Sequence, residues 1–96
     1  MAGYFLVDIL EVTAPAKMAE YRKRINAIVE KFGGKYLVAG GQAEVVEGSW
    51  RPTFPVIIQF ASLEQAHRWY DSEDYRELKA MRLAATRGNA VFLPGL

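Results

Sequence analysis

The chain contains no cysteine and a single histidine among its 96 residues. Disulfide bonds, thiolate metal sites and cysteine nucleophiles are therefore excluded. A zinc or haem-type site at His67 would need carboxylates to supply every other protein ligand, and the residue sits in the middle of a helical pattern, where a structural role is the more ordinary one. We expect neither a metal nor a cofactor.

Neither sign of charge predominates, because twelve lysine and arginine residues are nearly balanced by eleven aspartate and glutamate residues. The only basic cluster, Arg22 to Arg24, lies on the polar side of a predicted helix, which is typical of a solvated face. No apolar stretch approaches the ~20 residues of a membrane span, and no signal peptide precedes the first strand pattern. We expect no nucleic-acid or membrane partner and a cytoplasmic location.

Catalytic signatures are missing as well. The glycine pairs Gly33-Gly34 and Gly40-Gly41 lack the strand-to-helix context and the lysine of a phosphate loop. No Gly-x-Ser-x-Gly elbow is present, so a nucleophilic hydrolase is disfavoured.

What the chain does contain is a regular succession of strand and helix patterns in one domain, residues 1–96. Apolar residues at helical spacing alternate with β-branched and aromatic runs. The expected strands are Tyr4–Val12, Lys35–Glu47 with a break at Gly40-Gly41, Pro55–Phe60 and Asn89–Leu93, and the expected helices run from Pro15 to Gly33 and from Ser62 to about Thr86. This order predicts an α+β fold in which a four-stranded antiparallel sheet carries its helices on one face, as in the βαββαβ arrangement.

The second helix carries two predicted start signals. Ser62 and Gln65 have the spacing of a reciprocal capping box. Asp71 and Ser72 offer a second cap, and the acidic residues that follow suit a first helical turn. We therefore expect a break near Asp71.

Both faces of the predicted sheet are apolar, although helices can cover only one of them. A solvent-facing antiparallel sheet would alternate polar and apolar residues, whereas Pro55–Phe60 and Asn89–Leu93 are nearly continuous apolar runs. Half of all residues (51%) are apolar, which is high for one small globule. We expect a second copy to cover the open face, giving a homodimer with a barrel-like interior.

Arg82 is the first candidate for a functional residue. Tyr75, Leu78, Arg82 and Ala85 recur at helical spacing, which places a guanidinium on the inward stripe. A buried arginine needs a partner. It is either an anion site, one half of an internal ion pair, or a side chain that reaches solvent at the edge of the stripe.

Asp8 is the second candidate, as the lone carboxylate of an apolar strand. It could act in proton transfer if its surroundings raise its pKa, or pair with an arginine or lysine across the sheet or the dimer interface. Trp50 and Arg51 lie in a loop where a tryptophan either anchors structure or lines a pocket. The residues that we consider as pocket candidates are Asp8, Tyr36, Trp50, Arg51, His67, Tyr70, Tyr75 and Arg82.

The sequence resembles, over nearly its whole length, the bacterial family called domain of unknown function 1330, in the dimeric α+β barrel superfamily. The resemblance is carried by Gly33 to Val38, Gly40-Gly41, Glu47 to Pro52, and Trp69 to Ser72 with Tyr75. Ala39 and Glu73 depart from the family pattern, which often has arginine and proline there. The resemblance implies a ferredoxin-like fold and a dimer, without an activity.

Two functions remain open at this point. By analogy with the wider superfamily, the protein binds a small apolar or anionic molecule between sheet and helices, as a cofactor-independent isomerase or a monooxygenase-like enzyme. The alternative is a non-catalytic structural or binding dimer whose aromatics fill the interior. An enclosed space of roughly 300 Å³ or more, with Arg or Asp converging on it, would favour ligand binding.

Overall fold

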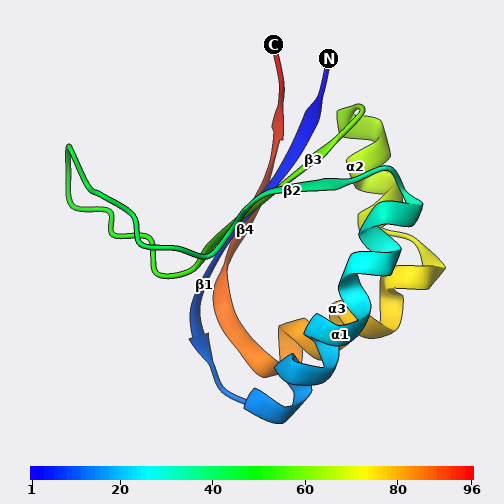
Figure 1. Ribbon diagram of the computed structural model, residues 1–96, viewed down its shortest axis with the longest axis horizontal. Coiled ribbons are helices and arrows are strands. Elements are labelled where there is room, and N and C mark those ends of the chain that lie inside the picture. Colours follow the sequence, from blue (N-terminus) through cyan, green and yellow to red (C-terminus); the bar gives the residue numbers. More distant parts are fainter.

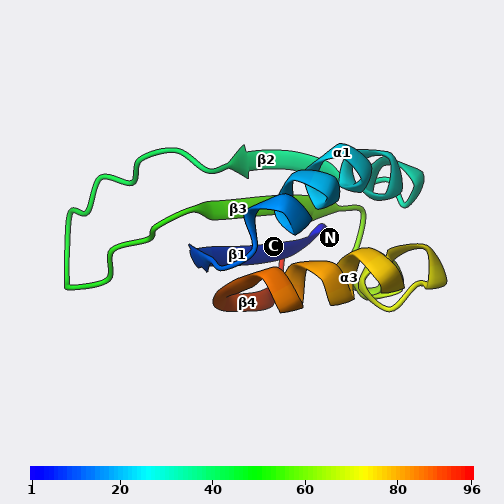
Figure 2. The ribbon, with the colours of Figure 1, turned by 90° about the horizontal axis from the view of Figure 1, so that it is seen from below.

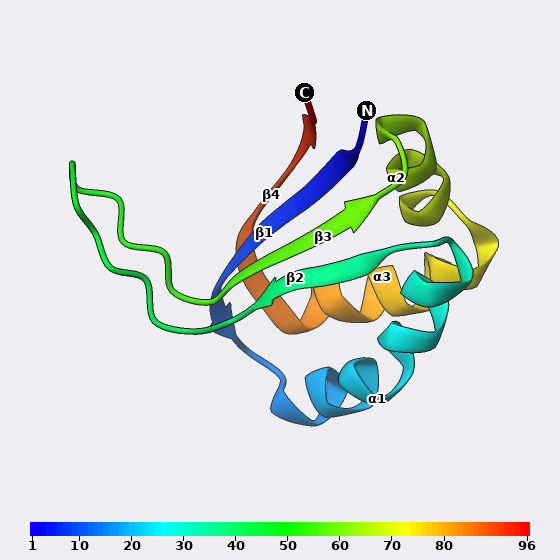
Figure 3. The same cartoon turned by 45° about the horizontal axis from the view of Figure 1, so that its top comes forward.

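Four strands form one antiparallel sheet in the order β2-β3-β1-β4, and three helices lie on one side of it (Figures 1 and 3). In the computed structural model, which describes residues 1–96, the elements follow the predicted order. They are β1 (Gly3–Val12), α1 (Pro15–Lys31), β2 (Lys35–Ala39), β3 (Pro55–Phe60), α2 (Leu63–Tyr70), α3 (Glu73–Ala85) and β4 (Thr86–Pro94). The predicted α+β fold with a four-stranded antiparallel sheet is confirmed.

The two faces of the sheet have different surroundings. Phe5, Val7 and Ile9 of β1 point towards the helices and are buried. The alternate residue Leu6 pairs with Ile57 on one side and with Val91 on the other, so these three side chains share the opposite face. We call this opposite face, which no helix covers, the open face.

Trp69 of α2 is the centre of the core. Its indole stacks on Tyr75 with ring centroids 4.4 Å apart and on Phe60 at 5.3 Å, and it meets Phe5 edge-on at 5.1 Å. The side chain is completely buried. Aromatic rings in these arrangements bury large apolar areas and stabilise the packing of helix on sheet.

The predicted caps form with one difference. Ser62 accepts a hydrogen bond from the Gln65 backbone N–H at 3.0 Å, but the Gln65 side chain donates to the Phe32 carbonyl, also at 3.0 Å. The expected reciprocal capping box is therefore wrong in its second half. The Phe32 carbonyl at the end of α1 competes more strongly for the Gln65 side chain, because the last carbonyls of a helix have no hydrogen-bond partner within it.

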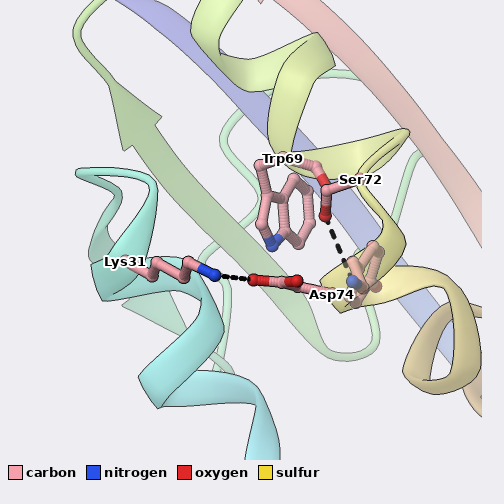
Figure 4. A network of polar contacts seen from close by, with 5 residues as sticks. Lys31, Trp69, Ser72 and Asp74 are labelled. Atoms are coloured by element: carbon pink, nitrogen blue, oxygen red, sulfur yellow. Dashed lines mark hydrogen bonds and ion pairs between the residues drawn. The ribbon is translucent and has the colours of Figure 1, made fainter.

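The helix break at Asp71-Ser72 is confirmed. The Ser72 hydroxyl accepts from the Tyr75 backbone N–H at 3.1 Å and donates to the Trp69 carbonyl at 2.8 Å, so it closes α2 and opens α3 (Figure 4). An ion pair between Lys31 and Asp74 ties the end of α1 to the start of α3. The break sets the direction in which α3 presents its inward side chains.

The second strand is shorter than expected, because β2 ends at Ala39 and no strand continues to Glu47. Gly40 has a φ of +83°, and a Cβ there would lie 2.5 Å from the Phe54 ring, so only glycine fits where the chain turns away. Residues 40–54, which we call the arm, extend beyond the sheet (Figure 2). The last strand is longer than expected and starts at Thr86, directly after α3.

None of the three helices has both the length and the apolar character that crossing a membrane would require.

Replacing Ser72 with alanine removes the side-chain cap of α3 and changes no other residue. We expect Ser72→Ala to lower the free energy of unfolding by about 1 kcal/mol, as measured by urea denaturation. Ser49→Ala, in the exposed arm, is the matched control and should leave stability unchanged. Equal stability of both variants with the wild type would contradict the role of Ser72.

Candidate functional site

A cavity of about 470 Å³ lies between the helix-facing side of the sheet and α1. Its position follows from the packing of the helices: α2 packs closely on the sheet, whereas α1 packs mainly on α3. Space therefore remains beneath α1. We call it the sheet–helix cavity; its lining residues, mostly apolar, are Phe5, Val7, Ile9, Met18, Tyr21, Arg22, Ile25, Asn26, Tyr36, Ala39, Phe54, Val56, Ile58 and Arg82.

One polar group of the cavity wall is a buried cation. Arg82 is 6% exposed and forms no ion pair. Its Nε donates a hydrogen bond to the Tyr75 hydroxyl at 3.2 Å, and the Tyr75 hydroxyl lies 2.7 Å from the hydroxyl of Tyr21 on α1. Its Nη2 is buried without a partner. Two of the three predicted alternatives for Arg82 are therefore excluded within the chain: it forms no internal ion pair, and its side chain does not reach solvent.

Burial and the tyrosine contacts keep these groups in fixed protonation states. Burial raises the pKa of Tyr21 far above its ordinary value, and its contact with Tyr75 raises the pKa further. Burial also raises the pKa of Tyr36 to about 12. Burial lowers the pKa of the Arg82 guanidinium, but the neighbouring tyrosine oxygens outweigh it and the net shift is upwards. At neutral pH the cavity thus contains neutral hydroxyl donors and one charged guanidinium in its depth.

The charge of the sheet–helix cavity is one-sided. Its ionisable lining residues are Tyr21, Arg22, Tyr36 and Arg82, and it contains no carboxylate and no histidine. A general base that works near neutral pH is usually one of those two groups. The charged side chains that line the cavity are therefore both positive, and none of its lining residues is a carboxylate or a histidine that could abstract a proton near neutral pH.

A second cavity, of about 310 Å³, lies between α3 and β4 and shares Arg82 with the first. Tyr70, Thr86, Arg87 and Asn89 supply much of its wall. The Thr86 hydroxyl donates to the Arg82 carbonyl at 2.7 Å, and Arg87 pairs with Glu11 at 3.3 Å on the surface. Arg82 thus forms part of the partition between two cavities.

Asp8 lies away from the sheet–helix cavity. It alternates with Val7 and Ile9 along β1, so its side chain is on the open face, where its Oδ1 accepts from the backbone N–H groups of Thr53 at 2.9 Å and Phe54 at 2.8 Å. No basic residue of the same chain pairs with Asp8, and pairing across a dimer interface stays a prediction. Asp8 instead fixes the base of the arm against the sheet.

The remaining candidates are dispersed. His67 stacks on Phe92 with ring centroids 4.2 Å apart. Trp50 is 64% exposed in the arm beside the exposed Arg51. Tyr75 is completely buried behind the cavity wall, where it supports Arg82.

Of the eight sequence candidates, only Tyr36 and Arg82 line the larger cavity. Tyr21 and Phe54 line it too, although neither was a candidate. Tyr21 had one signal in the sequence, since a tyrosine on an inward helical stripe needs a hydrogen-bond partner for its hydroxyl when buried. No local pattern marks Phe54, because its position depends on where the arm leaves the sheet.

Solved structures show the same fold in several proteins. A protein of unknown function from Rhodopseudomonas palustris is 18% identical, with a TM-score of 0.76 over 99% of this chain and 82% of its own. A dimeric ferredoxin-like protein of unknown function from Jannaschia sp. CCS1 is 14% identical, with a TM-score of 0.71 over 97% and 98%. A candidate antibiotic biosynthesis monooxygenase from Caulobacter crescentus CB15 is 17% identical, with a TM-score of 0.56 over 99% and 89%.

These likenesses, all below 25% identity, place the chain in the class of ferredoxin-like α+β proteins. No curated protein matches the sequence. The family model "Domain of unknown function (DUF1330)" matches residues 2–96, and the chain belongs to that family. The predicted family is therefore confirmed.

Tyr75→Phe tests the link between Tyr21 and Arg82. The substitution leaves the ring but removes the acceptor of the buried Arg82 Nε and the partner of the Tyr21 hydroxyl. We expect the free energy of unfolding to fall by about 1–3 kcal/mol, measured by urea denaturation.

The control is Tyr4→Phe, which removes a hydroxyl that forms no hydrogen bond, and which should change stability by less than about 0.5 kcal/mol. If both variants were as stable as the wild type, the hydroxyl of Tyr75 would not be holding Arg82 in place.

Proposed function

We propose that this protein is a homodimer that binds a small apolar or anionic molecule in the sheet–helix cavity. The single observation that carries the proposal is a cavity of about 470 Å³ with the buried, incompletely bonded Arg82 in its wall. Ligand sites are typically apolar clefts of roughly 300–1,000 Å³ with a few converging polar groups. The alternative, a dimer whose interior is filled by aromatic side chains, fits this volume less well.

An enzymatic version of the proposal would be a cofactor-independent isomerase or a monooxygenase-like enzyme. The similarity to the candidate Caulobacter monooxygenase bears on the fold and leaves the activity open. Because the cavity lacks a carboxylate or histidine, any reaction in it would have to proceed without such a base. We therefore propose binding as the function that the cavity supports best.

The open face supports the homodimer. Val91 and Leu93 of β4 are 48% and 45% exposed there, beside Leu6 and Ile57. Only 17 of the 96 residues are buried within one chain, so much apolar surface is left for association. A dimeric protein of the same fold is among the similar structures.

Filling the cavity tests the binding proposal. Ala39 lines the cavity, whereas Ala43 lies in the exposed arm. We expect 2-naphthoate to bind the wild type in calorimetric titrations, Ala39→Trp to weaken binding at least about tenfold, and Ala43→Trp to bind like the wild type. If the wild type bound neither 2-naphthoate nor its methyl ester, the cavity would not be a site for small aromatic ligands.

Light scattering tests the homodimer. We expect the wild type at micromolar concentration to have twice the chain mass of 10.8 kDa, because association buries the open face. Val91→Glu places a charge on that face and should give the single-chain mass, whereas Ala80→Glu, on the exposed side of α3, should leave the mass doubled. A wild type of single-chain mass would refute the homodimer.

A further inference from the structure

The guanidinium of Arg82 has an unused edge. Its one hydrogen bond is that from Nε to Tyr75, and the Nη2 atom is buried without a partner. A buried donor without an acceptor costs free energy, more so when it carries charge. The Nη1–Nη2 edge is also the part of an arginine that accepts a carboxylate in the two-bond arrangement. An anionic group in the cavity would therefore complete the bonding of Arg82.

The hydrogen-bond order of the two tyrosines follows from the position of Tyr75. Its oxygen already accepts from Arg82, and its own proton needs an acceptor because the residue is completely buried. The Tyr21 oxygen, 2.7 Å away, is its hydroxyl neighbour. If Tyr21 donated instead, Tyr75 would receive two donors and leave its own proton unbonded. The lower-energy order is Arg82 to Tyr75 to Tyr21.

This order leaves the proton of Tyr21 free. Tyr21 lines the sheet–helix cavity, whereas Tyr75 lies behind its wall. Tyr21 and Arg82 thus both line the same cavity, and the buried Tyr75 hydroxyl connects them.

We infer that Tyr21 and Arg82 together form an oxyanion site that selects ligands with an apolar, ring-sized body and one negatively charged oxygen group, a carboxylate or a phenolate. The inference rests on the proposed binding function and narrows it to a class of ligand. The walls around these donors are apolar, with Phe5, Ile58 and Val56 from the sheet. An ordinary apolar molecule would leave both donors unsatisfied.

The surrounding charges agree with this assignment. The other charged side chain of the cavity is Arg22, and no acidic residue of α1 or α3 lines it; Glu77 pairs with Arg24 and Asp74 with Lys31 on the outer surface. Because burial raises the pKa of Tyr21, the hydroxyl stays protonated over the working pH range. No carboxylate in the cavity repels an anion.

A pair of probes of nearly equal shape, 2-naphthoate and methyl 2-naphthoate, separates the charge from the apolar body. We expect the wild type to bind the anion at least about tenfold more tightly than the ester. Tyr21→Phe should weaken 2-naphthoate about tenfold and leave the ester unchanged. Because Arg82 variants disturb the core, the conservative Tyr21→Phe carries the test, and its unfolding curve serves as the check on folding.

The pKa of bound 4-nitrophenol gives an independent test, because an oxyanion site and a purely apolar cavity shift this pKa in opposite directions. An apolar cavity without donors raises the pKa of a bound phenol, whereas two donors, one of them cationic, lower it. We expect absorbance titrations at saturating protein to give a pKa below that of the free phenol, with a smaller decrease in Tyr21→Phe.

The outcomes distinguish failure of the oxyanion site from failure of the proposed binding function. Equal binding of anion and ester, or a raised pKa of nitrophenol, would overturn the oxyanion site and leave the cavity as a general apolar site. Binding of neither naphthyl probe would overturn both. Preference for the anion that survives unchanged in Tyr21→Phe would remove Tyr21 from the site and overturn the inferred pair.

Discussion

The burial of the Arg82 guanidinium is the constraint on which the rest of the arrangement depends. Taking a charged side chain out of water costs several kcal/mol unless other groups compensate. No carboxylate does so here, and only the Tyr75 hydroxyl accepts a hydrogen bond from the guanidinium. In a chain that buries few residues, this cost is a substantial share of the typical 5–15 kcal/mol of net stability. We propose that an anionic ligand offsets part of this cost.

The break between α2 and α3 helps to bring Tyr21, Tyr75 and Arg82 together. Ser72 ends α2 and starts α3, and Trp69 then packs its indole on Tyr75. Tyr75 and Arg82 are two turns apart on α3, so both point inwards. Tyr21 reaches them from α1, because α1 packs on α3 more than on the sheet. The same packing leaves the space beneath α1, so the cavity and its polar end have one origin.

Much of this architecture is readable from local patterns. The stripe of Tyr75, Leu78 and Arg82 predicts that the arginine is inward, and Asp71-Ser72 predicts the break; the structure confirms both. The open apolar face follows from strands that do not alternate. These features depend on residues close together in the sequence, where periodicity and capping chemistry act directly.

The partners of the candidate residues depend on contacts across the sequence, and local patterns do not determine those. Tyr21 and Tyr75 are 54 positions apart, and Asp8 meets Thr53 across 45 positions. The strand expected up to Glu47 has the valines of a β-strand, but Gly40 turns the chain away from β3. Strand propensity acts only when a neighbouring strand is present to pair with it.

The central claim is that the Nη1–Nη2 edge of Arg82 receives an anionic oxygen inside the sheet–helix cavity. A crystal structure of the protein soaked with 4-bromobenzoate tests it most directly, because the bromine can be located by its anomalous scattering. The account predicts bromine within the cavity and the carboxylate within hydrogen-bond distance of both Arg82 and the Tyr21 hydroxyl. A carboxylate bound elsewhere, or a cavity occupied by side chains of a second copy, would contradict it.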